Sequence, residues 1–229
     1  MLISIRKYAA ALFLLLGLTA LFLILIINCR FFYRFLLDPL HIPETSGLSR
    51  DEILLNYNCL IDYCSPFCRD ALEFPTFRSS GSALSHFAEV KNIFTALYLL
   101  APAGLLTAFW LFLQLPRRER PRALGAAGRL CLVLPAILLC LCALSFHDIF
   151  FDLHRILFRN NDWLFSAVSD PVITILPERF FLVCAKVLLL LLIISGALLV
   201  ALESVSSMRL RIRLRWLKTK PRRTQSARP

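Results

Sequence analysis

The sequence predicts an all-α membrane protein in which four transmembrane helices carry two extracytoplasmic loops that form a small lid over a site. Apolar residues make up 58% of the chain and its mean hydropathy is +0.69, which favours a membrane protein over a very hydrophobic soluble helical bundle. A helix needs roughly 20 mostly apolar residues to cross a hydrocarbon core about 30 Å thick. Four runs suit this length, at about residues 8–27, 93–115, 130–146 and 180–202, and only Lys186 carries a charge inside any of them.

The first run is predicted to be an uncleaved anchor rather than a signal peptide. Arg6 and Lys7 precede it, as basic residues precede a signal peptide. The run is longer than the usual apolar region of about 7–15 residues, however, and no small-x-small cleavage site follows it.

The distribution of charge predicts the orientation of the four helices. In a four-span arrangement, 16 of the 26 lysines and arginines fall on one side: two before the first run, five in residues 117–129 and nine after Glu203. Thirteen of the 15 acidic residues fall in the two loops on the other side. Lys and Arg gather on the cytoplasmic side of membrane proteins, so both termini are expected in the cytoplasm. These segments account for the net charge of +11, and we expect no nucleic-acid partner.

Two external segments are expected, at about residues 30–92 and 147–179. In the first, residues 48–61 have helical character, and Ser49 and Glu52 have the spacing of a capping box. A loop at 65–82 is followed by a helix that begins near Ser82 or Ser85 and runs straight into the second span. The second segment is expected to begin as a helical extension of the third span and to turn at residues 160–162.

The chain divides into a transmembrane domain over residues 1–205 and a basic cytoplasmic tail over 206–229. Arginines at every second position from 209 to 215 alternate with apolar residues in this tail. Such a pattern can lie on anionic membrane lipids, at about 1 kcal/mol per basic residue. The alternative is that these charges act only as a determinant of topology.

Three cysteines of the first external segment are candidates for a disulfide. An oxidising exterior permits a bridge among them, although sequence does not give the pairing. Without clustered histidines they are poor candidates for a zinc site, and we expect no metal. The three are Cys59, Cys64 and Cys68.

Two histidines lie close to the predicted membrane boundary. His86 is seven residues before the second span begins, and His154 is eight residues after the third span ends. If both segments continue outward as helices, both rings stand roughly 10–12 Å above the apolar core, near the depth of lipid ester linkages. Two imidazoles at one depth can act on an ester there; alternatively, they are ordinary polar residues that face water.

Other polar residues near these histidines can support such a site. Glu89 lies three residues after His86 and can orient its ring. Arg155, with its neighbouring charges, can instead belong to a solvated, partly paired helix surface. No nucleophile elbow, phosphate-binding loop or H-E-x-x-H pair is present. The supporting candidates are Glu89, Lys91, Arg155, Asn161 and Asp162.

Three passages of the chain resemble the bacterial lipoprotein intramolecular transacylases, the Lit family of four-span membrane proteins. The first is residues 51–63, the second 85–91, and the third, the most specific, runs from His154 through Trp163 to residue 181. The resemblance covers about residues 1–205. It implies transfer of the sn-2 acyl chain of a diacylglyceryl group to the α-amine of the same N-terminal cysteine, giving a lyso-form lipoprotein.

The resemblance also implies where the reaction occurs and which residues carry it. Diacylated bacterial lipoproteins would be the substrate, at the extracytoplasmic face of the bacterial cytoplasmic membrane and without a cofactor. The two functional histidines of the family map onto His86 and His154. Residues 147–151 fit the local His-x-Ile-Phe-Phe pattern of the family better, but the distance to Trp163 matches from His154. Glu89 stands where the family usually has Asp.

Elementary chemistry is compatible with that reaction. An α-amine with a pKa near 8 is mostly protonated at neutral pH, so attack on an ester needs a base, and an imidazole suits the task. The tetrahedral oxyanion needs a donor, which can be Lys91, Arg155 or the second imidazole. Two other functions use the same features. One is a non-enzymatic membrane scaffold or assembly factor, and the other is a lipid-ester hydrolase with water as the nucleophile.

Overall fold

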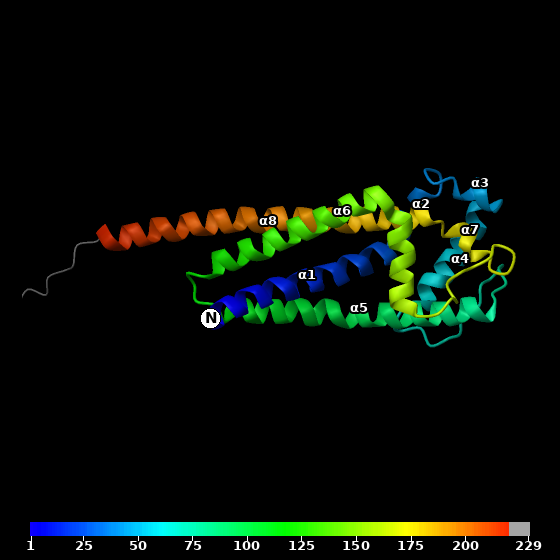
Figure 1. Cartoon of the computed structure of the whole chain (residues 1–229), viewed down its shortest axis with the longest axis horizontal. Helices are drawn as coiled ribbons and strands as arrows, with labels where there is room; N and C mark the ends of the chain where they lie inside the picture. The colour runs from blue at the N-terminus through cyan, green and yellow to red at the C-terminus, as the bar shows by residue number, and fades with distance from the viewer. Residues whose placement is uncertain (220–229) are drawn as a thin grey trace, which may run out of the picture.

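Four long helices run side by side and four short helices gather at one end of them (Figure 1). This computed structural model describes residues 1–219, and no strand occurs among them. The four long helices coincide with the predicted spans, so the all-α, four-span prediction is confirmed. In chain order the helices are α1 (Leu2–Asn28), α2 (Arg30–Leu36), α3 (Ile42–Ser46), α4 (Arg50–Tyr63), α5 (Gly81–Leu113), α6 (Arg120–Phe158), α7 (Val172–Ile175) and α8 (Glu178–Thr219).

Glycines let the long helices approach each other in two pairs. Between α1 and α5, a Cβ added at Gly17 would lie 2.8 Å from the backbone nitrogen of Leu105. Between α6 and α8, a Cβ at Gly128 would lie 2.8 Å from the carbonyl oxygen of Gly196, and one at Gly196 would lie 2.7 Å from that of Gly128. Helices in lipid associate through close packing at small residues rather than through the hydrophobic effect. These glycines therefore set the spacing of the bundle.

The short helices form a lid with a buried core of its own. The rings of Tyr33 in α2 and Tyr57 in α4 stack with centroids 3.5 Å apart, and the Phe180 ring at the start of α8 meets Tyr33 edge-on at 5.2 Å. The Tyr33 hydroxyl donates a hydrogen bond to the Ile175 carbonyl at 2.7 Å. The lid predicted from the two external segments is therefore a packed unit joined to the end of the bundle.

Helix starts in the lid follow the sequence signals. The Ser49 hydroxyl accepts a hydrogen bond from the Glu52 amide at 3.2 Å, so the predicted cap of α4 is confirmed. The Ser80 hydroxyl caps α5 in the same way, accepting from the Ala83 amide at 3.1 Å. From this cap α5 runs without interruption into the second span, as the sequence predicts.

The helix α6 extends beyond the third span to Phe158, as the sequence predicts, but it has a bend that was not predicted. Ser145 is non-helical (φ −153°, ψ 61°), and beyond it the helix turns across the end of the bundle toward α5 (Figure 1). A second helical segment follows Ser145, whose hydroxyl donates a hydrogen bond to the Asp148 carboxylate. This crossing segment, residues 146–158, lies over the ends of the spans. The height of roughly 10–12 Å was worked from a straight helix and does not carry over to His154, so the depth of its ring in the membrane stays a prediction.

At the other end, α8 passes residue 205 without a break. Most side chains of the predicted basic tail, and residues 220–229 entirely, lie outside the described part of the structure. The alternating arginine pattern of the tail therefore stays a prediction.

Candidate active site

The fold brings His86 and His154 together from segments 68 positions apart in the sequence. His86 lies on the part of α5 that extends beyond the second span, and His154 lies on the crossing segment of α6. Their ring centroids are 6.0 Å apart and the ring planes differ by 29°. The two imidazoles thus lie side by side, although α6 approaches α5 by a different route from the one expected.

Aromatic rings bury His86. Only 6% of its surface is exposed, and the rings of Phe158 and Phe165 meet it edge-on at 4.5 and 5.4 Å. Its Nδ1 atom is buried without a hydrogen-bond partner among the described residues. Burial and, to a smaller extent, nearby His154 lower the pKa of His86 to about 4, although the Asp162 carboxylate opposes the change. His86 is therefore neutral at physiological pH.

A backbone carbonyl fixes the tautomer of His154. Its Nδ1 lies 2.7 Å from the carbonyl oxygen of Phe150, one helical turn earlier, and a carbonyl only accepts. Nδ1 must therefore carry the proton, which leaves the lone pair of a neutral ring on Nε2. The ring is half-buried between Phe150 and Trp163, whose centroids lie 4.3 and 5.0 Å away. An imidazole held in this way is oriented to accept a proton at Nε2.

The turn after α6 holds this segment against α5. The Asn160 amide donates to the two carboxylate oxygens of Glu89 at 2.9 and 3.2 Å. The backbone carbonyl of Asn160 accepts a hydrogen bond from the indole nitrogen of Trp163 at 2.9 Å. The side-chain oxygen of Asn160 accepts one from the backbone amide of Asp162 at 3.1 Å. Glu89 was expected to orient the His86 ring, but its carboxylate is engaged by Asn160 instead. Asn160, absent from the sequence-derived candidates, links both helices of the site.

Two cationic candidates point away from the histidines. The Lys91 ammonium donates to the Cys68 carbonyl at 2.8 Å and lies over the Tyr63 ring at 4.3 Å. Five residues after His86, Lys91 sits about 140° around the helix, which explains its different direction. Arg155 pairs with Asp152 at 3.4 Å and its side chain is 70% exposed, so the solvated surface is the interpretation the structure supports. Asn161 is exposed too, and its carbonyl accepts from the Leu164 amide.

His147 lies apart from this pair. Its Nδ1 is 2.9 Å from a carboxylate oxygen of Glu178 at the start of α8, and 66% of its side chain is exposed. The hydrogen bond with Glu178 raises the pKa of His147 above its usual value. Of the two histidines that the sequence left in competition, His154 is the one placed beside His86.

The three candidate disulfide cysteines are free thiols in the structure. The Cys59 thiol lies 3.1 Å from the Glu73 carbonyl oxygen, and Cys64 is buried. Burial raises the pKa of Cys64 to about 12, so its thiolate, the reactive form, is scarce. Within residues 1–219 no group of three His, Cys, Asp or Glu side chains could hold a metal ion.

Comparisons with known proteins agree on one family. The family model of lipoprotein intramolecular transacylase Lit matches residues 8–181. A solved structure of the membrane integral lipoprotein intramolecular transacylase Lit from Bacillus cereus is 28% identical, with a TM-score of 0.87 over 92% of this chain and 98% of that chain. Two forms of that protein with a substituted histidine also match, each with a TM-score of 0.82. The form with arginine covers 93% of this chain and 95% of its own, and the form with alanine covers 92% of this chain and 96% of its own. No curated protein sequence matches the chain.

Proposed function

The chain belongs to the lipoprotein intramolecular transacylase (Lit) family, and we propose that His86 and His154 form the centre at which it transfers an acyl chain. The activity of the family is intramolecular acyl transfer within a lipoprotein, so the protein is an acyltransferase rather than a scaffold. The observation that carries the proposal is the pair of stacked imidazoles 6.0 Å apart, one buried and neutral, the other fixed in a single tautomer.

In this proposal His154 is the base. Its Nε2 removes a proton from the α-ammonium of the lipoprotein's N-terminal cysteine, whose pKa lies near 8. The freed amine nitrogen attacks the carbonyl carbon of the sn-2 ester. The carbon–oxygen bond to glycerol then breaks as the leaving alkoxide takes the proton held by His154. The neutral Nε2 then takes the extra proton that remains on the attacking nitrogen and passes it to solvent. An amide and a free glycerol hydroxyl result, and no acyl-enzyme forms.

His86 has the complementary role. A neutral imidazole donates one N–H and adds no positive charge to the site. Enzymes that use a neutral histidine as an electrophile work in the same way. We assign its N–H to the oxyanion of the tetrahedral intermediate. Lys91 and Arg155, the other donors considered, point elsewhere. The aromatic side chains around His86 exclude water, which strengthens that hydrogen bond.

Because these aromatic side chains exclude water, the nucleophile of hydrolysis, they also favour transfer over hydrolysis. The two reactions differ in mass balance, since transfer gives an isomer of the same mass whereas hydrolysis removes one fatty acid. The test is to incubate the purified protein with a synthetic diacylglyceryl-cysteine lipopeptide and analyse the products by tandem mass spectrometry. The proposal predicts an unchanged parent mass with fragment ions that carry the acyl chain on nitrogen. Loss of one fatty acid would show a hydrolase, and unaltered substrate would contradict catalysis.

We further propose that the histidine end faces the extracytoplasmic side of the bacterial cytoplasmic membrane, with both termini in the cytoplasm. The basic α5–α6 link lies at the opposite end of the bundle, together with the N-terminus (Figure 1). The positive-inside rule supports this orientation. Diacylated bacterial lipoproteins, anchored in the outer leaflet, would meet the histidines there. The basic tail would lie on anionic lipids of the inner leaflet.

A further inference from the structure

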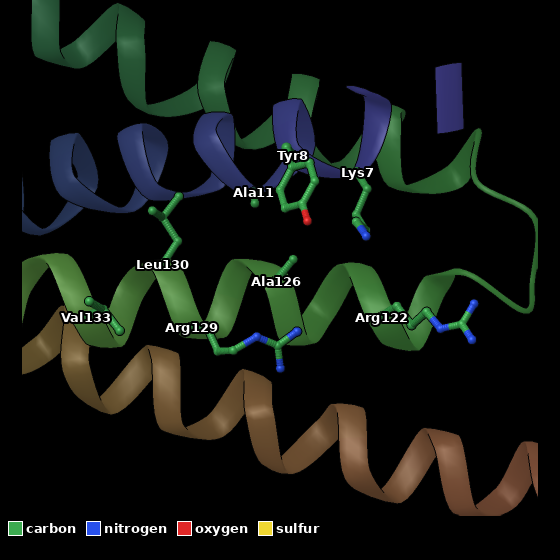
Figure 2. Close-up of a pocket in the computed structure, with 8 residues that line it drawn as sticks. All are labelled: Lys7, Tyr8, Ala11, Arg122, Ala126, Arg129, Leu130 and Val133. Atoms are coloured by element: carbon green, nitrogen blue, oxygen red, sulfur yellow. The ribbon is translucent and has the colours of Figure 1, made fainter. Parts of the chain in front are cut away.

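A hollow of about 590 Å³ lies between α1 and α6, toward the N-terminal end of α1 and away from the histidines (Figure 2). It opens where residues 7–11 of α1 run beside residues 122–133 of α6, and small alanines on both helices leave the space. The acyl-transfer proposal gives this hollow no role. Its volume is in the range of sites that hold small molecules and lipid headgroups.

Cationic and polar groups gather at the outer part of the hollow. Lys7 and Tyr8 project from α1, and Figure 2 shows the ammonium and the phenol hydroxyl directed into the gap toward α6. Arg122 and Arg129 contribute from α6. Arg129 is paired with Glu203 at 3.0 Å, and Arg122 is paired with Glu119, three residues earlier in the chain. Within residues 1–219 Lys7 has no ion-pair partner, so the hollow keeps an uncompensated positive charge.

The inner part of the hollow is apolar. Leu130 and Val133 line it farther along α6, toward the middle of the third span (Figure 2). Val133 is 58% exposed, so an acyl chain can pass over it from the bilayer. The order of groups along the hollow, cationic at the membrane boundary and apolar beyond, matches the order of groups along a phospholipid.

We propose that this hollow binds an anionic glycerophospholipid of the leaflet at the basic end of the bundle. The lipid phosphate would accept hydrogen bonds from Lys7, Tyr8 and Arg122, and an acyl chain would follow Leu130 and Val133. Basic pockets between transmembrane helices take such headgroups because the site neutralises the phosphate while the chain stays in hydrocarbon. A bound lipid would bridge α1 to α6 and so stabilise the folded bundle.

The experiment measures lipid binding to the purified full chain by native mass spectrometry. The probes are phosphatidylglycerol, phosphatidylcholine and inorganic phosphate. We expect phosphatidylglycerol to bind more tightly than either of the others. Lys7→Gln and Arg122→Gln should each weaken its binding about fivefold, the factor equivalent to about 1 kcal/mol per basic residue. Phosphatidylglycerol should also raise the unfolding temperature of the unmodified chain more than that of these variants.

Two further variants keep the test specific to the hollow. Arg118→Gln removes the same charge from an exposed position of the link that does not line the hollow, so it should leave binding unchanged. Val133→Trp fills the apolar part without changing charge and should weaken phosphatidylglycerol binding. Equal losses in Lys7→Gln and Arg118→Gln would overturn the proposal in favour of diffuse surface attraction. Inorganic phosphate binding as tightly as the lipid, or no effect of Val133→Trp, would also overturn it.

Discussion

The neutral state of His86 can be tested by opening the aromatic wall that buries it. The lowered pKa of about 4, against about 6.5 for an unperturbed histidine, corresponds to roughly 3 kcal/mol of preference for the neutral ring. Phe158 supplies the ring that lies nearest to His86, with centroids 4.5 Å apart. In Phe158→Ala water would reach His86, and its pKa should rise toward 6.5.

The assay is a pH titration of the histidine ring signals by NMR in detergent micelles. Phe151→Ala is the matched control, because Phe151 lies on the same segment but contacts His147 and Trp163 rather than His86. In this control the pKa of His86 should stay near 4, whereas that of His147 stays above its usual value. A pKa of His86 near 6.5 in the unmodified protein would refute the reasoning.

The same pKa predicts how stability depends on pH. The unfolded chain protonates this histidine near pH 6.5 and the folded protein only near pH 4, so the unfolded state binds more protons between these values. The contribution of His86 to the free energy of unfolding should therefore decline by up to roughly 3 kcal/mol as the pH falls from 6.5 to 4. Substitution by Asn should remove this acid-induced loss.

Three further predictions concern topology, packing and thiols. Cysteine labelling should find a residue at Ser80 accessible from outside and one at Arg120 from inside, and the reverse for Arg120 would contradict the proposed orientation. Gly196→Val should lower stability by about 1–3 kcal/mol in thermal unfolding, because its Cβ would lie 2.7 Å from a backbone oxygen, whereas Gly81→Ala, with nothing within 4 Å, should be neutral. Two of the three lid thiols are predicted to be bridged in the mature protein, and alkylation of all three without prior reduction would rule this out.

Sequence predicted those features that depend on local pattern. The length of the apolar runs and the distribution of charge were sufficient to predict the four long helices. The spacing of Ser49 and Glu52 was sufficient to predict the cap of α4. The break in α6 had a local signal too. Ser145 and Asp148 have the spacing of a capping box, but inside an apolar helical pattern that spacing is easily read as continuous helix.

The supporting residues of the site depend on contacts that local pattern does not contain. The helical position of Lys91 could have excluded it, because it points about 140° away from His86. Glu89 could not be assigned in this way, since its partner Asn160 is 71 residues away and approaches only because α6 turns across the bundle. Long-range geometry, rather than composition or spacing, decides which polar groups surround the two imidazoles.

The central claim is that His86 and His154 act together, and one comparison tests it most directly. The lipopeptide assay should be run with His86→Ala, His154→Ala and His147→Ala, each purified and shown to unfold at a temperature close to that of the unmodified chain. A general acid–base group contributes typically 10²–10⁴-fold in rate, so the first two variants should nearly lose the N-acylated isomer. His147→Ala should stay close to full rate, because its ring pairs with Glu178 on α8, away from the site. An inactive His147→Ala beside an active His154→Ala, or full activity in all three, would contradict the account.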